Sequence, residues 1–252
     1  MTYGTLALTL IFVLIPIVLS KTLNLGLERD AIIATVRSIV QLLAVGYLLE
    51  FVFEAENPIF ILLMITLMIA AATHNVQRKG MVIPGITAKV ALTFIVVEVL
   101  TQGILLGFDI IPATPQYIIP ISGMVIGNSM VLAILFLNRF SSEVEGRRDE
   151  IELLLSLGGT PRQAIHRRLL QAIKASMIPT LESQKTMGLV QLPGMMSGQI
   201  IAGADPIEAV QFQLLIIFLI MTNAAVTSAM LGFLSYPALF NSRMQLTKEQ
   251  SK

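Results

Sequence analysis

Long apolar runs, separated by short polar stretches, dominate the hydrophobic pattern of this chain. A helix that crosses a bilayer needs about 20 mostly apolar residues. The runs that qualify are residues 3–20, 31–51, 58–74, 89–107, 118–138, 186–204 and 213–235. The pattern therefore predicts an all-α polytopic membrane protein with about seven transmembrane helices, folded as a single domain over residues 1–252.

Two of these runs need comment. Residues 3–20 lack the basic flank and the small-residue cleavage site of a signal peptide, so we expect a retained helix. The run 186–204 is interrupted by Pro193 and Gly194. Because proline removes a helical hydrogen bond, we expect this sixth span to be broken there, with Pro193 and Gly194 as a hinge.

A charged, helical segment from Ser141 to Lys174 lies between the fifth and sixth spans. Residues 144–157 are predicted to form one helix, ended by Gly158 and Gly159. Thr160 is a good N-cap and Pro161 suits the first position of a second helix over 161–174. We interpret residues 141–174 as an inserted cytoplasmic loop.

A short, stiff helix at a tight glycine turn has the shape needed to bind a soluble partner, an ATPase in our interpretation. The alternative is a basic helix that rests on anionic lipid headgroups. The residues predicted to couple the chain to an ATPase are Gly158, Gly159, Thr160, Pro161, Arg162 and His166.

Charge distribution predicts the orientation in the membrane. Basic residues gather in loops 21–30 and 75–88, in segment 141–174 and in the tail, whereas the turns near 50–57, 108–117 and 205–212 carry only acidic residues. Since lysine and arginine favour the cytoplasmic side, we expect the N-terminus outside and the C-terminus in the cytoplasm of a plasma (inner) membrane. This alternation holds only with seven spans.

Composition narrows the chemistry. The chain is 55% hydrophobic and 13% charged, against about 25% charged residues in soluble domains. It has no Cys, which excludes disulfides and thiolate metal sites. No G-x-x-x-x-G-K-[ST], H-E-x-x-H or G-x-S-x-G motif occurs. We therefore expect no enzyme activity and no cofactor in this chain, membrane lipid around it, and no nucleic acid partner.

Polar side chains inside the predicted spans suggest a path for a substrate, because such groups usually face a cavity or a partner helix. Each one alone is better explained by hydrogen bonding between helices, and only the whole set suggests a path. Methionines gather near the interrupted spans, where thioethers would be soft metal ligands or flexible packing groups; no metal site is assigned. The path candidates are Glu98, Met124, Asn128, Met130, Gln191, Met195, Met196 and Gln199.

Glu182 and Lys185 stand three residues apart on the same helical face. The Glu182 carboxylate is a further candidate for contact with the substrate along its path. We prefer an ion pair between the two side chains at the membrane surface.

Four segments carry a resemblance to a known family. They are V-R-S-I-V-Q-L at 36–42, T-H-N-V-Q-R-K at 73–79, P-I-S-G-M-V-I-G-N-S-M at 120–130 and I-P-T-L-E-S-Q-K-T-M-G-L-V-Q-L-P-G-M-M-S-G-Q at 178–199. In these the chain resembles the FetB-like permeases, over nearly its whole length.

The resemblance implies a permease subunit of an ABC transporter that pairs with a separate ATPase subunit, which holds ATP and Mg. It also implies an exporter linked to iron, with plant relatives linked to aluminium tolerance. On this basis we expect a homodimer of the permease with one ATPase on each copy. The alternatives are a stand-alone ion channel or secondary transporter that uses Glu98, and a non-transporting scaffold whose basic loop binds a soluble partner.

Overall fold

The computed structural model describes residues 9, 11–55, 57–80, 83–241 and 243–247. Within these residues the chain is helical, with two isolated β-bridges and no strand. The chain divides into two compact units, Met1–Asn57 and Pro58–Lys252.

The first unit contains α2 (Ile11–Thr22) and α3 (Glu28–Ala55), which pack on each other. Ser20 fixes the turn between them: its Oγ accepts from the Leu27 amide at 3.0 Å and donates to Glu28 Oε1 at 2.9 Å. The turn also uses Gly26 at φ 70°, a left-handed conformation that glycine adopts without steric cost.

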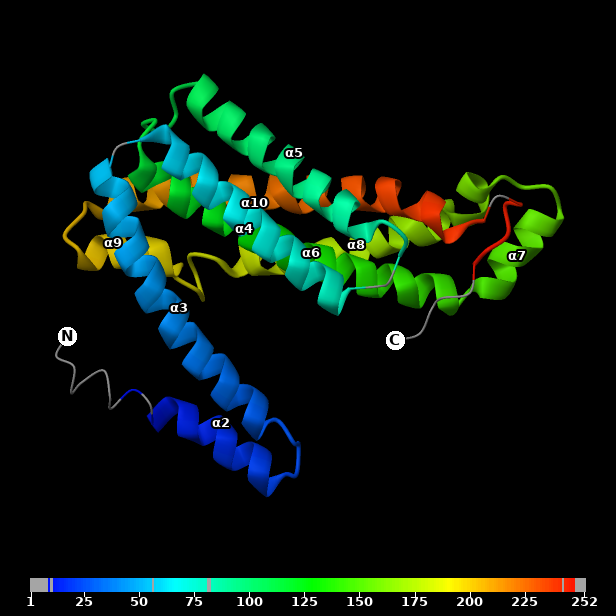
Figure 1. Ribbon diagram of the computed structural model, residues 1–252, viewed down its shortest axis with the longest axis horizontal. Coiled ribbons are helices and arrows are strands. Elements are labelled where there is room, and N and C mark those ends of the chain that lie inside the picture. The colour runs from blue at the N-terminus through cyan, green and yellow to red at the C-terminus, as the bar shows by residue number, and fades with distance from the viewer. Residues whose placement is uncertain (1–8, 10, 56, 81–82, 242, 248–252) are drawn as a thin grey trace. The chain divides into compact units, whose positions relative to one another are not determined.

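The second unit is a bundle centred on α6 (Pro115–Glu145), which packs on α4, α5, α8 and α10. Figure 1 shows these helices side by side, with α7 at the same end of the unit as the C-terminal segment. The bounds are α4 Pro58–Lys79, α5 Ile86–Gly107, α7 Arg148–Ser156, α8 Pro161–Thr186, α9 Gly194–Ile201, α10 Pro206–Ser235 and the 3-10 helix η1 Tyr236–Leu239.

Two apolar clusters hold this bundle together. The larger one is built around Phe136 and Phe140 of α6, whose rings stack at 5.5 Å, and it reaches α4, α5, α7 and α8. The smaller one joins α5, α6 and α10 through Val97, Val125 and Ile216. Small residues bring helices together: a Cβ on Gly232 of α10 would lie 2.8 Å from the Leu169 Cδ1 atom of α8.

Most of the predicted spans are confirmed. Five helices in the described part of the chain are long and apolar enough to cross a membrane: α3, α4, α5, α6 and α10. They match the predicted spans 31–51, 58–74, 89–107, 118–138 and 213–235. Of the first predicted span, residues 3–8 and 10 lie outside the described residues, residue 9 is in a turn, and residues 11–20 fall in α2. The chain is therefore a polytopic all-α membrane protein.

The prediction of a membrane-spanning helix over residues 186–204 is wrong. Residues 187–193 are not helical, and α9 has 8 residues, or about 12 Å of helix, too short for a hydrocarbon core of about 30 Å. Instead α8, with 26 residues and about 39 Å of length, runs back along α6 and α10 (Figure 1). Its charged residues lower its hydropathy, and α8 is not among the described helices that are apolar enough to cross a membrane.

The bounds predicted for the cytoplasmic loop, 141–174, also change. Ser141–Glu145 continue α6, and Lys174 lies in the middle of α8. The predicted second helix does not stand off the bundle, because Ala164, Ile165, Leu169 and Ala172 are buried against other helices. What projects is α7 and the turn after it, residues 148–160.

Candidate functional site

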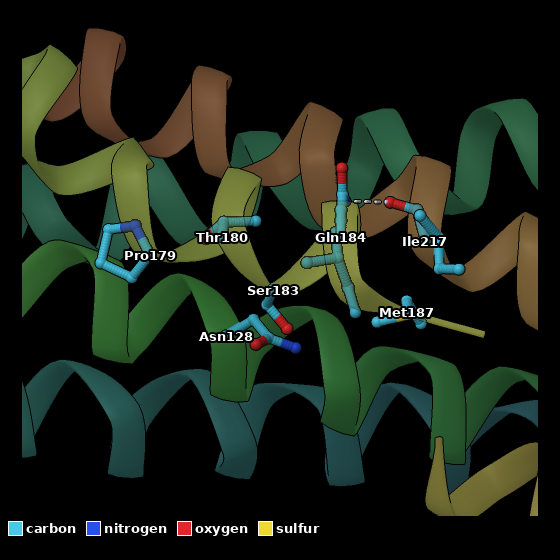
Figure 2. A pocket seen from close by; sticks show the side chains of 8 residues that line it. Asn128, Pro179, Thr180, Ser183, Gln184, Met187 and Ile217 are labelled. Carbon is cyan, nitrogen blue, oxygen red and sulfur yellow. Dashed lines mark hydrogen bonds between the residues drawn. The ribbon is translucent and has the colours of Figure 1, made fainter. Parts of the chain in front are cut away.

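A cavity of about 260 Å³ lies between α6, α8 and α10. Its lining consists of Asn128, Pro179, Thr180, Ser183, Gln184, Met187, Ile217 and Ile220. Figure 2 shows the Asn128 amide of α6 and the Ser183 hydroxyl of α8 pointing toward one another. The cavity therefore presents polar groups of two helices to a common space.

Hydrogen bonds fix both amides of this lining. Asn128 Nδ2 donates to the Met124 carbonyl at 2.9 Å, and Gln184 Nε2 donates to the Ile217 carbonyl at 3.0 Å (Figure 2). A carbonyl oxygen only accepts, so it must be met by the nitrogen of each amide. Each amide oxygen is thereby left to accept from a ligand.

The cavity is open to the surface on one side and lies partway along α6 and α10. Asn128 is 13 residues into α6 and Ile217 is 11 residues into α10, so both lie about 17 to 20 Å from the ends at which these helices begin. Pro179 of the lining lies within the unbroken helix α8, and helical structure is interrupted just beyond the cavity, over residues 187–193. Interrupted helices at mid-membrane are a usual location for substrate sites of transporters.

The predicted ion pair of Glu182 and Lys185 is confirmed, with Lys185 Nζ 2.6 Å from Glu182 Oε1. Its predicted position at the membrane surface stays a prediction. The pair lies in the last turn of α8, next to Ser183 and Gln184 of the cavity, and both side chains are exposed. Local spacing predicted the pair, but it carries no information on depth.

Glu98, a predicted path residue, is buried between α5 and α6. Its Oε1 accepts from Ser122 Oγ at 2.5 Å and from Gln102 Nε2 at 3.1 Å. Its second oxygen and the Gln102 Oε1 have no partner among the described residues. Glu98 is not in the cavity lining, so the structure does not bring it together with Asn128.

Further buried polar pairs tie α10 to its neighbours. Thr101 Oγ1 of α5 donates to Asn223 Oδ1 at 3.1 Å, and Ser176 Oγ of α8 lies 3.0 Å from Ser228 Oγ. In a bilayer such bonds join helices that have little hydrophobic reason to associate. These residues act in packing.

The methionines predicted for the path separate in the structure. Met124 and Met195 both pack against the Val97–Ile216 cluster, whereas Met130 packs against the phenylalanine cluster and accepts from Asn75 Nδ2 at 3.2 Å through its sulfur. Met196 is half-buried on α9. The described residues contain no group of three or more His, Cys, Asp or Glu that could hold a metal.

The predicted hinge residues stand at the start of α9. Pro193 is its N-cap and Gly194 its first residue. Gln191 closes the preceding turn, since its carbonyl accepts from the Gly188 amide at 2.9 Å. Gln199 is half-buried on α9. The break in the chain is thus wider than the Pro193-Gly194 pair and begins where α8 ends.

The turn between α7 and α8 is built as the sequence predicted. Gly158 has φ 87°, and a Cβ on Gly159 would lie 2.7 Å from the Leu154 carbonyl oxygen. Thr160 and Gln163 form a capping box, with the Thr160 amide 2.9 Å from Gln163 Oε1, and Pro161 begins α8. Arg162 and His166 are exposed on the first turns of α8.

Arg168 attaches α7 to the bundle. Its buried guanidinium forms ion pairs with Glu150 of α7 and, at 3.9 Å, with Glu143 of α6. Desolvation opposes ionisation of Glu150, but hydrogen bonds and charges from Arg168 and Arg147 outweigh it and lower the pKa of this carboxyl. Arg148 adds a bond to the Leu246 carbonyl at 3.2 Å.

Sequence reasoning missed Thr180, Ser183 and Gln184 of the cavity. The signal was present, because polar residues recur at helical spacing through T-L-E-S-Q-K-T at 180–186. It was passed over because this stretch fell between the loop and the sixth predicted span, where a polar helix face looks like a solvated surface.

A bundle of long apolar helices around buried polar groups and a cavity defines a polytopic membrane protein. The chain belongs to the family described as "Uncharacterised protein family (UPF0014)", which matches residues 3–240.

Three relatives illustrate the family. The UPF0014 membrane protein YjkA of Bacillus subtilis (strain 168) is 58% identical over 99% of this chain and 100% of its own. The "Probable iron export permease protein FetB" of Escherichia coli (strain K12) is 36% identical over 100% of this chain and 97% of its own. "Protein ALUMINUM SENSITIVE 3" of Arabidopsis thaliana is 33% identical over 95% and 88%. None of the solved structures matches the chain.

Proposed function

We propose that this chain is the membrane-spanning subunit of an ATP-driven exporter of iron or a metal-linked substrate. The name of the Escherichia coli relative, an iron export permease, supports the direction and the cargo. ATP and Mg are held by a separate ATPase, because the sequence has no P-loop. The chain itself holds no cofactor.

The observation that carries this proposal is the exposed leucine surface of α7. Leu153, Leu154 and Leu157 are 59%, 45% and 76% exposed at one end of the bundle. A cluster of exposed leucines on a charged end is typical of a surface that a soluble protein covers. We propose that the ATPase binds there, and that the turn of Gly158, Gly159, Thr160 and Pro161 transmits its movement to α8.

The attachment of α7 supports a mechanical role. Ile151 is buried on its inner side, the Arg168–Glu150 ion pair holds α7 to α8, and the Arg168–Glu143 pair ties α8 to α6 at the same place. A push on α7 therefore reaches the helix that lines the cavity, without passing through a flexible linker. We propose that Arg162 and His166, exposed next to the turn, form the polar rim of the same surface.

Two copies of the permease, each with one ATPase, form the transporter in this proposal. It lies in the plasma (inner) membrane with α7 in the cytoplasm, the N-terminus outside and the C-terminus inside. Basic residues near α7, among them Arg139, Arg147 and Arg167, support this orientation. The exit path leads along α8 past Asn128 toward Gln191, Gln199 and the methionines of α9.

A secondary transporter that uses Glu98 is the second candidate. The buried carboxylate, with one oxygen unpartnered among the described residues, favours it, since ionisable groups at membrane depth often relay ions. Against it stands the leucine surface of α7, for which a transporter without a partner has no use.

The test is co-purification of the chain with a candidate ATPase subunit, using a Leu153→Ser/Leu157→Ser double variant. Burial of each leucine contributes about 1.5 kcal/mol, so the double variant should weaken binding about 100-fold. A Leu153→Met/Leu157→Met variant keeps the surface apolar and should bind normally. Undiminished binding by the serine variant would show that the ATPase does not dock on α7.

A further inference from the structure

The cavity beside α8 opens to the surface of the second unit. Glu182 and Lys185 flank it with side chains 60% and 67% exposed on the surface of the second unit, and Thr186 is exposed one residue further on. Charged groups deep in a membrane protein face protein or a water-filled space, because lipid solvates them poorly. This face of α8 is therefore not a lipid-facing one.

The polar groups of the lining are neutral acceptors. Asn128 and Gln184 each offer an amide oxygen, since one N–H of each amide is held by a backbone carbonyl and fixes the orientation of the group. Thr180 and Ser183 add hydroxyls, and Met187 a thioether. The lining contains no carboxylate, imidazole or thiolate. A divalent cation that has lost its water needs such ligands to offset dehydration.

The volume admits an ion that keeps its water. Six waters at about 30 Å³ each take up about 180 Å³, which fits within the 260 Å³ of the cavity. The waters around a cation donate hydrogen bonds outward, and the amide oxygens and hydroxyls of the lining accept them. Neutral acceptors suit this arrangement, because they bind the ion weakly enough to release it.

We propose that this cavity is the substrate site of the permease and that it binds a divalent cation with its hydration shell intact, through Asn128, Thr180, Ser183 and Gln184. The inference rests on the proposed function for its cargo. It differs from metal ligation by Met124, Met195 and Met196, which pack elsewhere in the unit or on α9.

Water access is tested first, in the full chain reconstituted in lipid nanodiscs. The chain has no cysteine, so Ser183→Cys introduces a single thiol, and only a hydrated thiol ionises and reacts. Ser183→Cys should react with a small water-soluble thiol reagent at least tenfold faster than Val131→Cys. Val131 is the matched control: it lies one turn from Asn128 on α6, and this apolar residue is 59% exposed.

Protection from this reagent then identifies the ligand. Cobalt(III) hexammine imitates a hexahydrated cation but cannot exchange its ligands, whereas Mn²⁺ can. Both should slow modification of Ser183→Cys, and adding Asn128→Leu should raise the concentration for half-protection about tenfold. Thr180→Cys, with protection measured in the same way, replaces Ser183→Cys should that variant fail to fold.

Other results overturn the proposal. Equal rates at residues 183 and 131 would mean that no water reaches the cavity. Protection by Mn²⁺ but not by cobalt(III) hexammine would mean that the site binds a dehydrated ion. Protection by neither compound would exclude divalent cations. Each of these outcomes leaves ATPase binding to α7 untouched, so a failure here is distinct from a failure of the proposed function.

Discussion

The side chain of Glu98 combines burial with two hydrogen bonds to one of its oxygens, from Ser122 and Gln102. A carboxylate that only stabilises the fold and a carboxylate that couples transport to an ion require different properties of residue 98. The structural role needs an acceptor of the right length, while coupling needs a group that can bind and release an ion.

Glu98→Gln and Glu98→Asp separate these roles. Gln keeps the length and the accepting oxygen, so in an ATP-driven permease ATP-dependent Fe²⁺ uptake into inside-out vesicles should stay within about twofold. Asp is shorter and breaks both hydrogen bonds, which contribute about 1 kcal/mol each, so its thermal stability should fall more. The reverse order of transport, Asp active and Gln inactive, would favour the secondary transporter.

Residue identity alone predicted some contacts and missed others. The Glu182–Lys185 pair follows from helical spacing and forms. Thr160 caps α8, as the sequence Gly159-Thr160-Pro161 predicts. The partners of Glu98 were predictable only for Gln102, one turn away on the same helix. Ser122 comes from α6, and no local pattern indicates which residues of another helix will face a given side chain.

Arg168 is the residue through which α7, as an element, is tied to the bundle. Arg168→Met removes its ion pairs with Glu143 and Glu150, while keeping an unbranched apolar stem that fits the buried site. Both carboxylates are at least 37% exposed, so water can solvate them and the bundle should stay folded. We expect hydrogen exchange in α7 to rise about tenfold and ATPase affinity to fall.

Arg167→Met is the matched control for this change, because Arg167 is the exposed neighbour on the same helix. Unchanged exchange in α7 in the Arg168 variant would contradict the attachment. Mild acidification should not have the effect of the Arg168→Met substitution. Since the pKa of Glu150 is lowered from 4.5, the pair persists as the pH falls through 4.5 and is lost only below that value.

Helix ends were easier to predict than the roles of helices. The glycine turn and the cap before α8 are local chemistry, and both appear where expected. The continuation of α8 past residue 174 to Thr186 is not local: small buried residues such as Ala172 and Ser176 pack against its neighbours. Pro179 is accommodated because it lies on the exposed, cavity-lining side.

At the scale of the whole molecule, charge divides the ends of the second unit. Arg147 and Arg148 lie at the start of α7, whereas Asp109 follows α5 and Asp205 precedes α10 at the opposite end of the unit. The C-terminal segment shares the α7 end, since the Leu246 carbonyl accepts from Arg148. The orientation of α7 therefore also gives that of the C-terminal segment, and an ATPase can reach α7 only from the cytoplasm.

Single cysteines in this cysteine-free chain test the orientation directly. Ser156→Cys on α7 and Thr22→Cys at the turn after α2 should be labelled by a membrane-impermeant maleimide only after spheroplasts are lysed. Ala204→Cys, between α9 and α10, should be labelled in intact spheroplasts. All three positions are exposed, so access depends on the side of the membrane and not on burial.

The pattern of labelling distinguishes three arrangements. Labelling of Ser156→Cys in intact spheroplasts would place α7 outside, where no ATP is available, and would exclude the ATPase on this surface. Labelling of Thr22→Cys and Ser156→Cys on opposite sides would mean an odd number of crossings between them, against the even number required by the basic loops. Labelling of Ser156→Cys and Ala204→Cys on the same side would mean that α8 and α9 do not return the chain across the bilayer, and the cavity beside Ser183 would then lie off any transport path.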